Sequence, residues 1–218
     1  MLDRTWPRDE RRTMTWIGAA AIAYGGLFFL SNLFSEFLLP AERSNGEITR
    51  LGLFLVYVGA YGVGALALLP ALRALNRVYR RHAAITRTGS IGLRIAAGGA
   101  AFQALFAAVY FGTAAATGDA AGAAFLLFAL GYLLTIVGSV TAGVSLIRTG
   151  TERSIGALLL VTAMAAIAMI VTPYPVHDVA LFSFAAGWIA IGLVLVRPLS
   201  RRSGRRATVA RARASTSS

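Results

Sequence analysis

The sequence predicts an all-α, polytopic membrane protein: a bundle of six transmembrane helices with short loops. Hydrophobic residues make up 57% of the 218 positions and charged residues only 14%, well below the figure of about 25% that is usual in soluble domains. The charges gather in short segments between long apolar runs. A helix needs about 20 apolar residues to cross the hydrocarbon core of a bilayer, and the chain offers six runs near that length.

The first three runs predict helices over residues 14–39, 51–72 and 91–116. The first run is too long for a signal peptide and no small-residue cleavage site follows it, so we expect a permanent helix. After the second run comes LRALNRVYRRH, in which arginines at helical spacing share one face. We therefore expect the second helix to continue beyond the bilayer as a basic segment.

The last three runs predict helices over residues 121–147, 155–172 and 179–196. The segment TPYPVHD separates the fifth helix from the sixth, and its two prolines end the fifth helix and hold the connection extended. Asp178 then stands where the sixth helix needs an N-cap, and its negative charge suits the positive end of the helix.

The distribution of arginine predicts the orientation. All 21 basic residues are arginine, and by this topology all but Arg43 and Arg50 fall on one side of the membrane. Since basic loops stay in the cytoplasm, we expect both termini to be cytoplasmic. The chain then divides into a cytoplasmic segment (1–13), a transmembrane domain (14–196) and a basic tail that we expect to be disordered (197–218). The abundance of alanine, glycine and arginine points to a GC-rich bacterium, and hence to a bacterial cytoplasmic (inner) membrane.

The net charge of +12 does not predict binding to nucleic acid, because the arginines flank membrane spans and no soluble domain presents them as a face. Basic segments beside a membrane are attracted to anionic lipid head groups. We therefore expect the partner of these segments to be the lipid bilayer at its cytoplasmic face. The residues expected to contact head groups are Arg73, Arg77, Arg80, Arg81, Arg201, Arg202, Arg205 and Arg206.

Small residues recur every four positions along the third predicted helix. Small side chains let membrane helices approach closely, which is a main source of their association. We expect this stripe to pack against a neighbouring helix, and it leaves a protein partner or a homo-oligomer open. Its members are Gly92, Ala96, Ala100, Ala104, Ala108 and Gly112.

Few polar residues occur inside the predicted spans, and intramembrane polar groups are the first candidates for function. Gln103 sits near mid-membrane, where its amide must either pair across helices or line a cavity. Glu36 is either an interfacial carboxylate in water or a buried carrier of a proton or cation. Together with groups expected at the outer surface, these residues form a candidate cavity or outer mouth: Asn32, Glu36, Gln103, Tyr110, Tyr174, His177 and Asp178.

The chain has no cysteine, which excludes disulfides, thiolate metal sites and cysteine nucleophiles. No spacing of His, Asp and Glu predicts a metal site, no nucleotide-binding or hydrolase motif occurs, and we expect no cofactor and no catalytic residue. We favour a non-enzymatic membrane protein, an accessory subunit or an oligomer that acts through helix packing. The alternative is a small transporter or channel for a proton, cation or small solute, and an intramembrane enzyme is the least favoured.

Overall fold

The computed structural model describes residues 7–33, 51–117, 122–173 and 176–196, with the helix backbone alone described for 51–61, 111–117 and 122–125. All regular secondary structure in these segments is helical, which confirms the prediction of an all-α chain. The elements are α1 (Arg8–Leu33), α2 (Leu51–Arg81), α3 (Arg87–Thr117), α4 (Gly122–Thr149), α5 (Arg153–Val171) and α6 (Val176–Val196).

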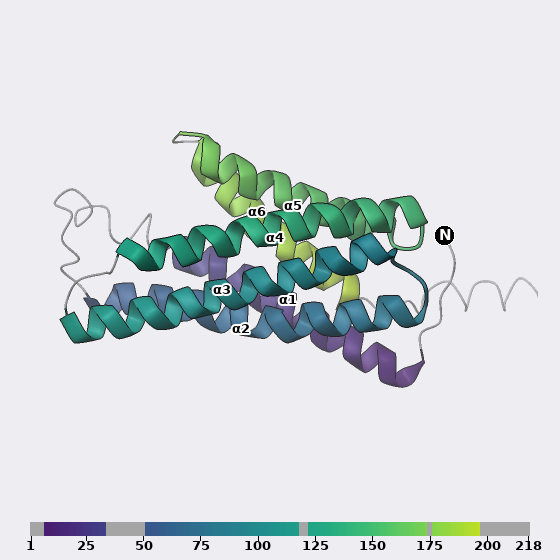
Figure 1. The fold of residues 1–218 in the computed structure, drawn as a ribbon, viewed down its shortest axis with the longest axis horizontal. Coiled ribbons are helices and arrows are strands. Elements are labelled where there is room, and N and C mark those ends of the chain that lie inside the picture. Colours follow the sequence, from purple (N-terminus) through teal and green to yellow (C-terminus); the bar gives the residue numbers. More distant parts are fainter. Residues whose placement is uncertain (1–6, 34–50, 118–121, 174–175, 197–218) are drawn as a thin grey trace, which may run out of the picture.

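The six helices form a closed ring. Each helix packs against the next one in the chain, and α6 packs against α1. Figure 1 shows an elongated bundle in which the α2–α3 and α4–α5 connections lie at the same end. The start of α1 lies at this end too, because Nε2 of His82, just after α2, is 2.6 Å from Oε2 of Glu10. This end of the molecule, called here the arginine-rich end, carries the basic residues that flank α2 and α3.

Within the described residues, five helices are long and apolar enough to cross a membrane: α1, α3, α4, α5 and α6. The six-span prediction is thus confirmed for five helices. The remaining helix, α2, has described side chains only from residue 62 onward, where an apolar stretch runs through Pro70 into four arginines, so its span over 51–72 stays a prediction. The five apolar helices indicate a multi-pass membrane protein.

The outer surface is apolar in a way that suits lipid. Large aliphatic side chains on α4, α5 and α6 lie more than half exposed, among them Leu126, Leu133, Val161, Met164 and Val179. Such residues would be unfavourable in contact with water, but the hydrocarbon of a bilayer accepts them.

Aromatic side chains fill the inside of the ring. The rings of Phe28 and Phe184 lie 4.8 Å apart between centroids, and Tyr24 meets Trp188 edge-on at 5.6 Å. The Tyr132 ring of α4 contacts both, 6.2 Å from Phe28 and 5.7 Å from Phe184 between centroids. Aromatic pairs favour such tilted and edge-to-face arrangements, and this cluster joins α1, α4 and α6 across the interior.

Several helices begin earlier than the sequence predicted. The helix α1 starts at Arg8, α3 at Arg87 and α6 at Val176, because hydropathy marks where hydrocarbon begins, whereas helical hydrogen bonding continues into the polar boundary. The N-cap assigned to Asp178 was therefore wrong: Asp178 lies inside the first turn of α6. Its charge still faces the positive end of the helix dipole.

A short connection joins α2 to α3. The amide of Ala84 donates to the Tyr79 carbonyl at 2.9 Å and the amide of Ala83 donates to the Arg80 carbonyl at 3.2 Å. Ala83 has a φ of 48°. This paired pattern, with a left-handed residue just past the helix, is the Schellman motif that ends many helices.

The connection is also held by the α4–α5 turn. The hydroxyls of Thr149 and Thr151 both donate to the Ala84 carbonyl, at 3.1 and 2.7 Å. The Thr86 amide donates to Oγ of Ser145 at 3.1 Å. Side chains from α4 and its following turn therefore fix the backbone of the α2–α3 connection.

Candidate functional site

Gln103 is buried inside the ring, with 2% of its surface exposed. The Tyr24 hydroxyl donates to its Oε1 at 2.7 Å, and its Nε2 donates to Oγ1 of Thr135 at 3.2 Å. The Thr135 hydroxyl in turn donates to the Gly131 carbonyl at 2.8 Å. Of the two roles predicted for Gln103, the described geometry is the pairing across helices, which ties α1, α3 and α4 together.

Asn32 is also buried, at 4% exposed. Its Nδ2 donates to the Phe28 carbonyl of its own helix at 2.7 Å, so this hydrogen bond remains within α1. Glu36, predicted with it as part of the candidate cavity or outer mouth, lies outside the described residues. Tyr110 is half-buried near the far end of α3, where its ring packs on Phe106 at 5.4 Å between centroids.

His177 and Asp178 lie at the α5–α6 hairpin. Nδ1 of His177 is 2.7 Å from the Met169 carbonyl, to which it donates, and the His177 amide donates to the Pro173 carbonyl at 3.1 Å. The described hydrogen bonds of His177 therefore join the start of α6 to the end of α5. Those of Gln103 lie inside the ring, and no described bond connects the two residues. Tyr174, the other residue predicted at this mouth, lies outside the described residues.

The contact between α3 and α4 follows small residues, but not the strict four-residue stripe. A Cβ atom at Gly92 would lie 2.8 Å from the Gly138 carbonyl oxygen, and one at Gly131 would lie 3.0 Å from the backbone nitrogen of Gln103. The contact line on α3 is Gly92, Ala96, Gly99 and Gln103.

The alternation of four- and three-residue steps keeps this line on one face of a helix with 3.6 residues per turn, whereas repeated four-residue steps rotate away by about 40° each. Ala96 and Ala100 are buried, while Ala104 is only partly buried and Ala108 is exposed. Including Ala108 in the packing stripe was therefore wrong for contacts within the chain. The packing of Gly112 lies outside the described side chains.

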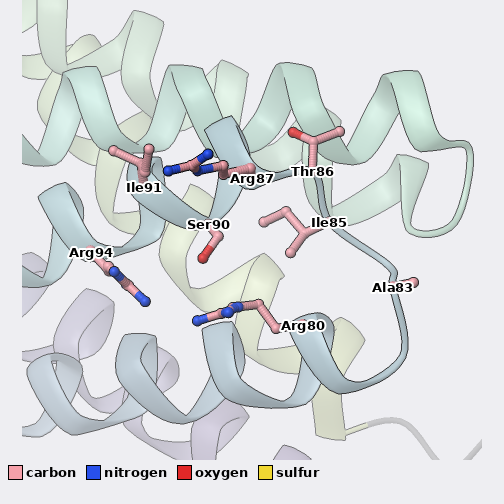
Figure 2. A pocket seen from close by; sticks show the side chains of 8 residues that line it. All are labelled: Arg80, Ala83, Ile85, Thr86, Arg87, Ser90, Ile91 and Arg94. Carbon is pink, nitrogen blue, oxygen red and sulfur yellow. The ribbon is translucent and has the colours of Figure 1, made fainter.

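Two adjoining pockets lie at the arginine-rich end, where α2 meets α3. The first, of about 610 Å³, is lined by Arg80, Ala83, Ile85, Thr86, Arg87, Ser90, Ile91 and Arg94. The second, of about 440 Å³, is lined by Arg73, Asn76, Arg77, Arg80, Arg81 and Arg94. Arg80 and Arg94 line both pockets. Figure 2 shows their guanidinium groups, one from each helix, pointing into a shared space beside the Ser90 hydroxyl.

The pockets are strongly basic. No acidic side chain lines either of them, and within the described part of the chain their arginine side chains form no ion pair or hydrogen bond. Asn76 is 7% exposed, and its Oδ1 has no hydrogen-bond partner among the described residues. A positively charged hollow with an unpaired buried amide is suited to an anion that carries further polar groups.

Some of the pocket residues had been assigned a different role from the sequence. Arg73, Arg77, Arg80 and Arg81 were expected at lipid head groups; all four line the second pocket, and Arg80 lines both. The opposing Arg94, together with Asn76 and Ser90, was missed. The short connection between α2 and α3 does predict that the two helices are neighbours. The composition of α3 does not show which of its faces turns toward α2, and so the position of Arg94 opposite Arg80 could not be predicted. Arg201, Arg202, Arg205 and Arg206 lie outside the described residues.

No group of three or more His, Asp or Glu residues that could hold a metal ion occurs within the described segments. Comparison of the chain with protein-family models, curated proteins and solved structures finds no match.

Proposed function

We propose that the chain is a non-enzymatic integral membrane protein that acts through its helix surfaces, as an accessory subunit or a homo-oligomer. We place it in a bacterial cytoplasmic membrane with both termini in the cytoplasm, because nearly all its arginines then lie on the cytoplasmic side. The arginine-rich end would rest against anionic head groups. In this role the bundle is a stable frame, and its outer faces and its basic end make the contacts.

The observation that carries this proposal is the pairing of Gln103. Both ends of its amide are bonded to side chains of other helices, and an aromatic cluster packs beside them. A polar side chain that lines a transport route offers hydrogen-bond donors or acceptors to water or solute, whereas the described hydrogen bonds of Gln103 join helices to one another.

The alternative, a small transporter or channel, is favoured by a different observation. Nε1 of Trp188 is buried and has no hydrogen-bond partner among the described residues, and its ring lies against Tyr24. An unpaired buried donor is unfavourable, and a water molecule or a polar solute beside Tyr24 would satisfy it.

Single-cysteine labelling separates the two functions, because the natural chain has no cysteine. Cysteine is placed at Asp178, at Gln103 and, as a nearly isosteric probe of the interior, at Ser139, which is 2% exposed. A membrane-impermeant maleimide is added from outside intact cells or right-side-out vesicles. We expect labelling at 178 and silence at 139 and 103. Reaction at 139 would mean that water reaches the interior, and would favour transport over the accessory role.

The accessory and oligomeric roles are separated by mass. Native mass spectrometry of the purified protein gives its oligomeric state. A pure monomer would exclude the homo-oligomer and favour the accessory subunit. Labelling at position 178 also tests the topology. If the folded protein did not react there, the proposed orientation would be wrong.

A further inference from the structure

We propose that the two pockets between α2 and α3 form a binding site for one anionic phospholipid, whose phosphate lies between Arg80 and Arg94. This inference rests on the proposed membrane location and cytoplasmic placement of the arginine-rich end. It goes beyond a general attraction to head groups, because it assigns a defined place, a stoichiometry of one and a preferred head-group chemistry.

The two central arginines supply the charge recognition. Arg80 comes from α2 and Arg94 from α3, and both line both pockets. Guanidinium groups bind phosphate oxygens through paired, charge-assisted hydrogen bonds. Because neither arginine has an ion pair in the described structure, and no carboxylate lines the pockets, their bonding capacity is available to a ligand.

The polar atoms around the arginines point to a head group with more than a phosphate. Asn76 lines the second pocket, is 7% exposed and has an unpaired Oδ1. An amide oxygen accepts hydrogen bonds, so a hydroxyl on the head group would satisfy it, while the Ser90 hydroxyl in the first pocket can donate to a phosphate oxygen. The chemistry that fits is a phosphodiester with a hydroxyl-bearing head group, such as phosphatidylglycerol.

The apolar side of the site favours a lipid over a soluble phosphate. Ile85 and Ile91 form part of the wall of the first pocket, and Ile91 is 46% exposed. Seven and fourteen residues further on, on the same face of α3, lie Gly98, with open space where a Cβ would be, and Leu105, 49% exposed. This line gives an acyl chain an apolar path that leads away from the phosphate, whereas a soluble anion would make no apolar contact with Ile91.

The frame around the site is fixed before any ligand binds. The connection between the two helices is held by Thr149 and Thr151 at the Ala84 carbonyl, and His82 is paired with Glu10. A preorganised site loses less conformational entropy on binding, so a single lipid is expected to stay bound in detergent.

The test is native mass spectrometry of the full-length, delipidated protein titrated with phosphatidylglycerol. We expect one lipid to bind in preference to zwitterionic phosphatidylcholine. The double variant Arg80→Ala/Arg94→Ala is expected to weaken the first binding step at least about tenfold, because each lost charged hydrogen bond is worth more than a tenfold change in affinity. Arg80→Lys/Arg94→Lys keeps the charge without the fork and is expected to lose part of this affinity.

The matched control is Arg148→Ala/Arg153→Ala, which removes the same charge at the same end of the bundle but outside both pockets. Equal weakening by the two double variants would overturn the site, because only diffuse charge would then be at work. Equal binding of phosphatidylcholine would do the same. Displacement of the lipid by millimolar glycerol phosphate would reassign the site to a soluble phosphate ligand.

The head-group assignment has its own variant. Asn76→Leu keeps the site filled but removes the amide, and it is expected to reduce a preference for phosphatidylglycerol over phosphatidylmethanol, which lacks the hydroxyls, by about two- to tenfold. An unchanged preference would remove Asn76 from recognition. These titrations do not depend on the labelling of position 103 or 139, so failure of the lipid site and failure of the accessory role are distinguishable.

Discussion

The hydroxyl of Tyr24 donates to Oε1 of Gln103 across 2.7 Å, linking α1 to α3 inside the ring. The two residues are 79 positions apart in the chain, and both are almost completely buried. The bond joins helices that are not consecutive in the ring, so it fixes the rotation of each helix relative to the other, which small-residue contacts between neighbours leave less well determined.

Tyr24→Phe is expected to lower the free energy of unfolding by about 1 kcal/mol, because the substitution leaves a buried amide oxygen without its donor. Gln103→Leu is expected to lower it by a similar or larger amount, since two partners are lost. A double-mutant cycle on the purified protein, unfolded with SDS in mixed micelles, measures the coupling between the two side chains. We expect about 0.6 to 1.7 kcal/mol.

Ser183→Ala provides the comparison for this cycle. Its hydroxyl is exposed and donates to the Val179 carbonyl of its own helix, so its removal should change the unfolding free energy by less than about 0.5 kcal/mol. A coupling of zero between Tyr24 and Gln103 would contradict the bond described here.

The role of Gln103 shows where sequence reasoning succeeds and where it stops. An amide at mid-span needs a partner, and pairing across helices was one of the two roles expected for Gln103. The partner Tyr24 was not predicted, because contact across the ring depends on how far each helix is rotated, and rotation is decided by packing among all six helices. Hydropathy is a local property of the sequence. It therefore predicted the number and rough ends of the helices, but it could not predict the contact between Tyr24 and Gln103.

Gly92→Ala is expected to destabilise the bundle by about 1 to 3 kcal/mol, because the added methyl group would lie 2.8 Å from the Gly138 carbonyl oxygen and push α3 from α4. Thermal unfolding followed by circular dichroism in detergent measures the change.

Gly98→Ala is the matched substitution, made on the same helix at a glycine with open space around it. It should be neutral or slightly stabilising, because alanine is the better helix former. If both variants lost the same stability, the loss would come from the glycine backbone and not from the α3–α4 contact.

Ala83→Gly is expected to stabilise the protein by about 0.5 to 1 kcal/mol. Ala83 has a φ of 48° at the end of α2, a left-handed conformation that costs an L-residue about 1 to 2 kcal/mol and glycine almost nothing. The greater freedom of glycine in the unfolded chain offsets part of the gain. The midpoint of unfolding in SDS measures the effect.

Ala74→Gly tests whether the gain at Ala83 comes from the conformation. Ala74 lies in the interior of α2, where glycine should lower stability by about 1 kcal/mol. Opposite signs for the two substitutions support the Schellman motif; the same sign would argue against it.

Tyr79→Phe is expected to preserve or raise stability near neutral pH. The Tyr79 side chain is fully buried in the core, and its hydroxyl has no hydrogen-bond partner within the described residues. Removing an unpaired buried hydroxyl relieves a desolvation penalty of about 1 kcal/mol or more, while the ring continues to fill its place. Unfolding of the two proteins at pH 8 measures the difference.

The alkaline range gives the same residue a second readout. Burial, and secondarily the negative charge of Glu152, raise the pKa of Tyr79 well above its ordinary value of 10.0. Because the folded pKa is the higher one, the folded state keeps its proton where the unfolded chain releases it, so stability falls as pH rises above about 10. Tyr79→Phe should make this fall shallower, and stability curves of equal slope above pH 10 would show that the ring is open to water.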